Sequence, residues 1–202
     1  NCYGSELDVW LSSDGVLFVN HDAVFKGHNV EQSSSAELSA IILDNGEHMP
    51  TLDEYLAKAK TLKTRIVLEL KAHQAKEKEA EAVAKIVEMV EKYGLTDRTE
   101  YISFSLFACK EFKRVAPQGT DIYYLNGELS PAELKTLGFA GFDYSMGPIK
   151  KHPEWIEEAH KLGLKVNVWT IDKEADMQWL IDQKVDFITT NEPVLLQQQL
   201  RK

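Results

Sequence analysis

The sequence predicts an α/β domain of repeated βα units, one unit short of a closed (β/α)8 barrel. Short β-rich runs alternate with amphipathic helical runs along the 202 residues, and the 44% of residues that are hydrophobic are spread throughout. Repeated βα units imply a parallel sheet covered by helices. The length and hydrophobic content favour one globular domain over residues 1–202 with a sizeable core.

The first quarter of the chain departs most from a regular alternation. The strand predicted at Ser5–Trp10 is followed by a hairpin return at Val16–Asn20. Residues 21–50 are irregular apart from a short helical signal at Ala36–Ile42, so we expect a loop excursion over the barrel mouth. A helix near Leu52–Leu62 then restores the alternation.

The rest of the chain alternates regularly, and some helix starts carry cap signals such as Ser130-Pro131. With the hairpin return set apart, we count seven βα units, whereas a closed barrel needs eight. Two unpaired strand edges would favour association, so we expect a homo-oligomer or a partner segment that fills the gap. The predicted elements are Arg65–Leu70, Lys76–Tyr93, Glu100–Phe104, a helix to about Val115, Asp121–Leu125, a helix from Ser130, Gly141–Tyr144, Pro153–Leu162, Lys165–Thr170, Lys173–Ile181, Phe187–Thr189 and Glu192–Leu200.

The charge balance limits the classes of partner. The net charge is -9, from 32 acidic and 23 basic residues. Nonspecific nucleic-acid binding is therefore not expected, because phosphate backbones are held chiefly by Lys and Arg. No run approaches the ~20 apolar residues that span a bilayer, so we expect a soluble chain without stable membrane insertion. The compartment, cytoplasmic or periplasmic and secreted, stays open.

Three acids and one lysine have the spacing of a shared site. Glu6 and Asp8 lie two residues apart in a strand, so both side chains leave the same face. Glu69 and Lys71 repeat this arrangement in the next full strand, at the end where barrel enzymes build active sites. Clustered acids repel each other unless a cation holds them, so we predict oxygen ligands for Mg²⁺ or Ca²⁺. The structural alternative is an internal salt bridge from Lys71 to one of the acids.

The hairpin connects a histidine to these acids. A turn over Ser12–Gly15 places His21 opposite Glu6, whereas a tighter turn at Asp14-Gly15 places it opposite Asp8. Either register predicts that the imidazole lies near the carboxylates.

Several motifs in a fixed order resemble one enzyme family over essentially the whole chain. In this order they resemble glycerophosphodiester phosphodiesterases, which are (β/α)8 TIM barrels of the PLC-like phosphodiesterase superfamily. The motifs are Glu6-Leu7-Asp8-Val9, Asp14-Gly15, His21-Asp22, Pro50-Thr51-Leu52, Leu68-Glu69-Leu70-Lys71, Val168-Trp169-Thr170 and Asp186-Phe187-Ile188-Thr189-Thr190-Asn191-Glu192-Pro193.

The resemblance implies an activity and roles for particular residues. It implies metal-dependent hydrolysis of a small-molecule glycerophosphodiester to glycerol 3-phosphate and an alcohol, a reaction of lipid and glycerol metabolism. Glu6, Asp8 and Glu69 would bind the divalent cation, and His21 would be one of two catalytic imidazoles. Lys71 would stabilise charge on the phosphate.

The chain also departs from the family pattern. The family opens with a strand ending in His-Arg-Gly, which carries the other catalytic histidine, whereas this chain begins close to Glu6. We therefore expect the first βα unit to be absent and hydrolysis by this chain alone to be severely slowed. A catalytically impaired metal- or phosphate-binding domain and a phospholipase of the same superfamily are the alternatives. Asn191 stands where aspartate is common, with an expected effect on local packing.

Other residues near predicted strand ends are weaker candidates. Trp169 could form an apolar wall for the glycerol or alcohol group, or belong to the core, and Phe104 has a comparable position. His73 follows Lys71 closely enough to reach the barrel mouth. The excursion histidines His28 and His48 could replace an imidazole or contact substrate, although exposed loop positions are the simpler interpretation.

Overall fold

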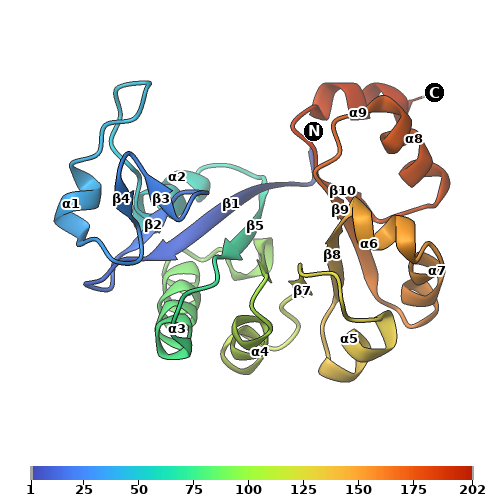
Figure 1. Ribbon diagram of the computed structural model, residues 1–202, viewed down its shortest axis with the longest axis horizontal. Coiled ribbons are helices and arrows are strands. Elements are labelled where there is room, and N and C mark those ends of the chain that lie inside the picture. The colour runs from blue at the N-terminus through green and yellow to red at the C-terminus, as the bar shows by residue number, and fades with distance from the viewer. Residues whose placement is uncertain (1, 202) are drawn as a thin grey trace. The chain divides into compact units, whose positions relative to one another are not determined.

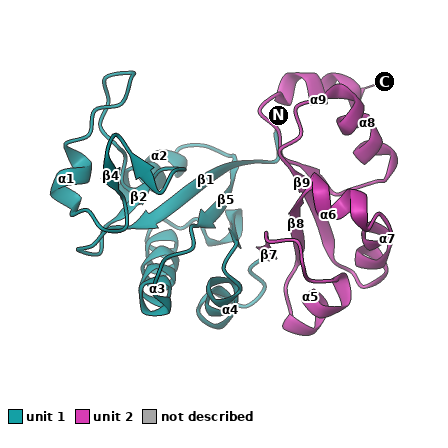
Figure 2. Cartoon of the chain, in the orientation of Figure 1, with its two compact units in different colours: residues 1–121 teal, residues 122–202 magenta. Residues whose placement is uncertain are grey.

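The chain forms two compact units in a computed structural model that describes residues 2–201 (Figure 2). The first unit comprises residues 1–121 and the second residues 122–202. Strands and helices alternate from β5 (Arg65–Leu70) to the end of the second unit, with α6 (Met146–Lys151) and α7 (Glu154–Lys161) in succession, so the predicted α/β class is confirmed. Over residues 2–201, none of the helices combines the length and apolar character that a bilayer crossing requires.

Within residues 2–121, the main sheet of the first unit has four strands in the order β6, β5, β1, β2, the last three of which are labelled in Figure 1. These strands are β1 (Gly4–Leu11), β2 (Leu17–Val19), β5 (Arg65–Leu70) and β6 (Thr99–Ser103). β1 pairs parallel with β5 and β5 pairs parallel with β6, whereas β2 returns antiparallel to the end of β1. β1 therefore contributes its first half to the parallel sheet and its last residues to a hairpin.

The hairpin turn differs from both registers predicted from the sequence. Val9 pairs with Val19, so Ser12 and Val16 close a three-residue loop through the Ser12 N–H, which donates to the Val16 oxygen at 2.9 Å. Gly15 lies at φ +83°, the left-handed position that three-residue hairpin loops require. Both predicted registers were therefore wrong by one residue, because the loop has three residues, whereas the predicted turns had four or two.

Four helical segments accompany the strands of the first unit outside the excursion. They are α2 (Leu52–Ala59), α3 (Lys76–Lys92), the short η1 (Thr96–Arg98) and α4 (Leu106–Val115). In α3 the buried Val83, Ile86 and Val90 recur at helical spacing, while most of the charged residues lie on other faces. α2 begins at a capping box in which Thr51 and Glu54 satisfy each other's backbone N–H groups.

The excursion at residues 21–50 is more ordered than the sequence indicates. It contains a two-stranded hairpin, β3 (Val24–Phe25) with β4 (His28–Asn29), and the helix α1 (Ser35–Ser39). Its apolar residues form a core with two residues of the β1–β2 hairpin. The buried members of this core are Trp10, Phe18, Val30, Leu38, Ile41 and Met49.

The second unit has four parallel strands in chain order, β7 to β10, alternating with helices. At Gly141 the neighbouring backbone leaves no space for a side chain, since an added Cβ would lie 1.9 Å from the Lys165 oxygen. α6 was not predicted, because Gly147 and Pro148 interrupt its apolar pattern. The elements are β7 (Ile122–Tyr124), α5 (Pro131–Leu137), β8 (Gly141–Ser145), α6 (Met146–Lys151), α7 (Glu154–Lys161), β9 (Lys165–Trp169), α8 (Glu174–Asp182), β10 (Phe187–Ile188) and α9 (Pro193–Gln199).

Candidate metal and phosphodiester site

Three carboxylates converge on two neighbouring strands of the first unit. Glu6 and Asp8 leave the same face of β1, and the parallel register sets Asp8 beside Glu69 of β5. One carboxylate oxygen from each acid lies within 4.8 Å of the others. The strand register thus brings together the three acids that the sequence analysis grouped.

Lys71 lies between two of these acids. Its Nζ is 2.7 Å from Oδ1 of Asp8 and 3.0 Å from Oε1 of Glu69. The Lys71 side chain is 13% exposed, and Glu69 is 6% exposed. The salt bridge considered from the sequence is therefore present, and it joins Lys71 to two acids.

Burial sets the electrostatics of the cluster. Removal from water raises the pKa of Glu69 to about 7, with a smaller contribution from Asp8, although Lys71 opposes the shift. Burial by itself would lower the pKa of Lys71, but the hydrogen bond to Asp8 and the charges of Glu69 and Asp8 raise it overall. The cluster therefore favours a cation between its carboxylates, a role that the Lys71 ammonium fills in part.

The donor set fits a hard divalent cation. Mg²⁺ and Ca²⁺ prefer carboxylate and other oxygen ligands, and three carboxylates within reach of one point provide them. Glu6 is exposed and Asp8 is half-buried, so the cluster is open to solvent on one side while Glu69 anchors it in the core. Such a site could hold a cation and leave coordination positions for a phosphate.

His21 lies beyond the end of the hairpin pairing. β2 ends at Val19, and the backbone N–H of Asn20 still donates to the Asp8 oxygen at 3.1 Å. The His21 side chain is 77% exposed, and its Nδ1 is 2.8 Å from Oδ1 of Asp22. The hairpin brings the chain at Asn20 back to Asp8, and the imidazole itself faces solvent beside its neighbour.

The predicted aromatic contacts belong to different units. Phe104 follows β6 in the first unit and is 38% exposed, an accessible position for a substrate contact. Trp169 ends β9 in the second unit, where its Nε1 donates to the Asp143 oxygen at 2.9 Å. A role in substrate binding stays a prediction for both residues.

The remaining candidate histidines differ in their surroundings. His48 in the excursion pairs with Glu54 at 2.9 Å, and His28 lies half-buried in β4. His73 makes polar contacts through both ring nitrogens, with the Leu11 N–H at 3.0 Å and the Lys71 oxygen at 2.7 Å. The sequence singled out His73 because it lies two residues after Lys71. Its hydrogen bond to Leu11 of β1 could not be predicted from that spacing.

Known proteins resemble this chain over nearly its full length. The family model described as the glycerophosphoryl diester phosphodiesterase family matches residues 4–195. A curated glycerophosphodiester phosphodiesterase from Caldanaerobacter subterraneus subsp. tengcongensis is 27% identical over 214 residues, covering 98% of this chain and 86% of the relative.

Solved structures show the same likeness. A glycerophosphodiester phosphodiesterase from Parabacteroides distasonis is 46% identical, with a TM-score of 0.96 over 98% of this chain and 84% of that chain. A phosphodiesterase from Oleispira antarctica, solved in complex with its product sn-glycerol-3-phosphate, is 24% identical, with a TM-score of 0.82 over 98% of this chain and 84% of that chain. The second likeness shows the fold alone. Together with the family match, these structures confirm the predicted barrel fold class.

Proposed function

Because the chain belongs to the glycerophosphoryl diester phosphodiesterase family, we propose that Glu6, Asp8 and Glu69 bind a divalent cation that takes part in phosphodiester hydrolysis. Family membership confirms the resemblance found in the motifs and the class of enzyme, a phosphoric diester hydrolase. The proposed substrate is a glycerophosphodiester, and the proposed products are glycerol 3-phosphate and an alcohol.

One observation carries the metal proposal. The carboxylate oxygens of three acids from two strands approach within 4.8 Å, although like charges at this separation repel each other. The cost of this arrangement is greatest at Glu69, whose burial already disfavours its charged form. A divalent cation at this point would offset both costs. The ligand set supports Mg²⁺ and Ca²⁺ equally.

The proposed chemistry divides between the cation and the side chains of this chain. A bound divalent cation would neutralise charge on the nonbridging phosphate oxygens. Lys71, whose ammonium lies against Asp8 and Glu69, donates to an oxygen of the same phosphate. As an oxygen of water bonds to phosphorus and the bond from phosphorus to the alcohol oxygen breaks, the water loses one proton and the alcohol oxygen gains one. His21 carries out one of these two proton transfers.

The test measures hydrolysis and its dependence on a divalent cation. Glycerophosphocholine and glycerophosphoethanolamine are incubated with the chain in Mg²⁺, Ca²⁺ or EDTA, and ³¹P NMR follows the release of glycerol 3-phosphate. Turnover that requires a cation and is lost in Glu69→Gln supports the proposal, with exposed Glu157→Gln as the matched control. Turnover that survives EDTA and Glu69→Gln would contradict it.

A binding domain with impaired catalysis is the second candidate, and the exposure of His21 favours it. The His21 imidazole is 77% exposed, and its Nδ1 pairs with Oδ1 of its neighbour Asp22. This candidate predicts that Mn²⁺ or Mg²⁺ binds to the cluster, measured by calorimetry, without turnover of either substrate.

A further inference from the structure

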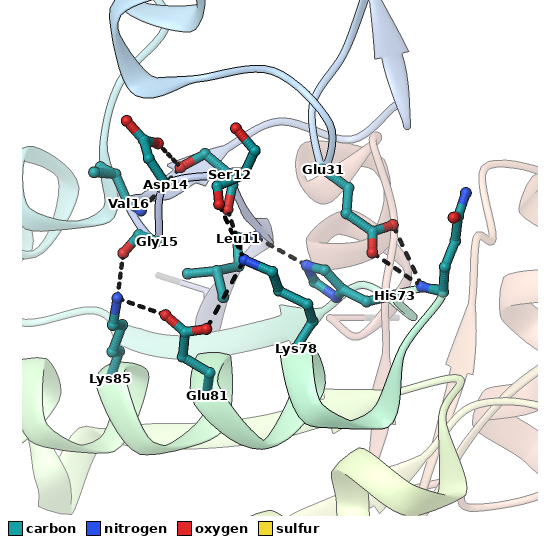
Figure 3. Close-up of polar contacts among 12 residues, drawn as sticks. Leu11, Ser12, Asp14, Gly15, Val16, Glu31, His73, Lys78, Glu81 and Lys85 are labelled. Carbon is teal, nitrogen blue, oxygen red and sulfur yellow. Dashed lines mark hydrogen bonds and ion pairs between the residues drawn. The ribbon is translucent and has the colours of Figure 1, made fainter.

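At the end of the β1–β5 ladder, a side chain stands where a hydrogen bond between two backbone groups would continue the pairing. The Lys71 N–H donates to the Val9 oxygen at 3.0 Å, as the parallel register requires. Continued by one step, the same ladder would have the Leu11 N–H donate to the Lys71 oxygen. Instead, the imidazole of His73 lies between these two groups. It is 2.7 Å from the Lys71 oxygen and 3.0 Å from the Leu11 nitrogen, the contact drawn in Figure 3.

The two contacts define one tautomer of His73. A backbone N–H can only donate, so Nε2 accepts from Leu11. A carbonyl oxygen can only accept, so Nδ1 carries the proton that is donated to Lys71. The neutral Nδ1–H imidazole thus bridges the Leu11 N–H of β1 and the Lys71 oxygen that follows β5, in place of a direct hydrogen bond between them.

A second set of buried contacts holds the imidazole in place. The backbone N–H of His73 donates to Oε1 of Glu79 at 3.1 Å, and Oε2 of Glu79 accepts from the Ser105 hydroxyl at 2.7 Å. Glu79 is 3% exposed in the first turn of α3. On the other side, the Trp10 ring lies with its centroid 5.3 Å from that of His73. The backbone of His73 is therefore fixed by Glu79 of α3, which also binds Ser105 at the start of α4, and its ring lies against Trp10 of β1.

The loop after His73 is fixed as well. The Gln74 N–H donates to Glu31 of the excursion at 3.1 Å, and Lys78 donates to the oxygens of Ser12 and Ser13 in the hairpin turn (Figure 3). Lys71 is the residue at which this fixed loop begins, and its ammonium reaches back to Asp8 and Glu69.

We propose that His73 is a positioning residue, which acts through the backbone of Lys71 to hold the Lys71 ammonium between Asp8 and Glu69. This inference rests on the proposed function of the cluster. His73 contacts neither substrate nor cation in the proposed reaction. By bridging Leu11 and Lys71, it sets the separation of the two chains just beyond the last β1–β5 backbone bond. It thereby sets the position of Lys71 relative to Asp8 and Glu69.

Three variants test the two hydrogen bonds of the His73 ring separately. His73→Phe keeps an aromatic ring against Trp10 and removes both hydrogen bonds, His73→Gln can still accept from Leu11, and His73→Asn can still donate to Lys71. The matched control is His152→Phe in the second unit, where the ring stacks on Trp155 and a phenyl group keeps that contact.

The first readouts are Mn²⁺ affinity by calorimetry without substrate, then kcat and KM, then the thermal midpoint. We expect His73→Phe to weaken metal affinity and lower kcat by about 10- to 100-fold, the usual effect of removing a group that orients ligands, with a smaller change in KM. His73→Gln and His73→Asn should recover part of both losses. A lower thermal midpoint with unchanged metal affinity and kcat would overturn the proposal.

A fourth readout, by NMR, does not depend on the proposed function. The NMR signal of the Lys71 ammonium reports its pairing with Asp8 and Glu69 in the metal-free protein. We expect slow solvent exchange of these protons in the wild-type chain and His152→Phe, and fast exchange in His73→Phe. If the wild-type chain neither binds Mn²⁺ nor turns over substrate, the proposed function fails, while slow exchange in His73→Phe would overturn the positioning role by itself.

Discussion

Two strand exits in the first unit carry the residues proposed to act on the phosphate, and they are held very differently. At the exit of β5, the Lys71 backbone bonds to β1 directly and through His73, and its side chain is 13% exposed. At the exit of β2, His21 is 77% exposed and contacts its neighbour Asp22. Charge stabilisation benefits from groups fixed in advance, whereas a proton-transfer group can tighten when substrate binds. In the proposed reaction, Lys71 at the β5 exit stabilises charge and His21 at the β2 exit transfers a proton, and the kinetics of His21 variants decide between this role and the binding domain with impaired catalysis.

The largest effect on kcat is expected at His21, the exposed residue at the β2 exit. We expect His21→Asn to lower kcat by about 10²–10⁴-fold, because a positioned proton-transfer group contributes that much. The free energy of unfolding should change by less than about 0.5 kcal/mol, since the side chain is exposed. Steady-state kinetics and urea unfolding measure the two quantities, with His48→Asn as the control. A kcat within a few-fold of wild type would remove His21 from the mechanism.

Substitution of Lys71 at the β5 exit should lower both activity and stability. Lys71→Met removes the ammonium from between Asp8 and Glu69 and should lower kcat/KM by about 10²–10³-fold, as for other preorganised donors. Breaking a buried charge cluster should also lower metal-free stability by about 3–5 kcal/mol. Lys150→Met, which breaks an exposed pair with Asp176, serves as the control. Equal stability losses in Lys71→Met and Lys150→Met would contradict the expected cost of breaking the buried pair at the β5 exit.

The stability of the metal-free protein should fall as the pH rises through the acidic range. Burial raises the pKa of Glu69 to about 7, so the folded state holds a proton that the unfolded state releases near its ordinary pKa of 4.5. Stability from this group is present below pH 4.5 and is lost up to pH 7, at most roughly 3 kcal/mol. Urea unfolding at a series of pH values measures this slope.

Two comparisons test the assignment of that slope to Glu69. Glu69→Gln should flatten it, because the variant has no proton to lose. Saturating Mg²⁺ or Ca²⁺ should reverse it, because the cation binds the ionised carboxylates. A slope that persists unchanged in Glu69→Gln would place its origin in another group.

The smallest effect is expected at the hairpin turn. Hydrogen bonds from Ser35 and Ser12 lower the pKa of Asp14 to about 2. The stabilisation is present above the ordinary pKa of 3.8 and is lost as the pH falls through 2. Asp14→Asn should therefore lower the thermal midpoint slightly at neutral pH, with no difference from wild type near pH 2. Its kcat should stay unchanged, and a loss comparable to that of His73→Phe would show that the turn also positions the site.

Local patterns in the sequence predicted the acids but not the geometry that joins them. Alternation along a strand places Glu6 with Asp8 and Glu69 with Lys71, so the two pairs could be found from spacing alone. The setting of Asp8 beside Glu69 depends on a register between distant strands, which no local pattern contains. The hairpin was predicted one residue out of register, because a single left-handed glycine decides the loop length.

Contacts between residues distant in the sequence, and strands too short to show a pattern, explain the other features that the sequence did not predict. His73 was considered for its distance from Lys71, but its bond to Leu11 spans sixty-two positions of the chain. The β3–β4 hairpin is two residues per strand, too short for an alternating pattern, and it turns through Lys26 and Gly27 at positive φ. The division at residue 121 has no compositional boundary in the sequence, and the prediction of a single domain stays a prediction.

The excursion begins and ends at the same place on the sheet. The Val19 N–H donates to the Pro50 oxygen at 2.9 Å, and Phe18 is bridged to Thr51, so the chain leaves and returns at touching points. Its own core lies against the far half of β1, beyond the residues that pair with β5. A segment with joined ends can be lengthened, shortened or replaced at little entropic cost to the rest of the protein. Residues 21–50 therefore form an insertion whose length can change at little cost in loop closure, while Glu6, Asp8 and Glu69 lie outside it on β1 and β5.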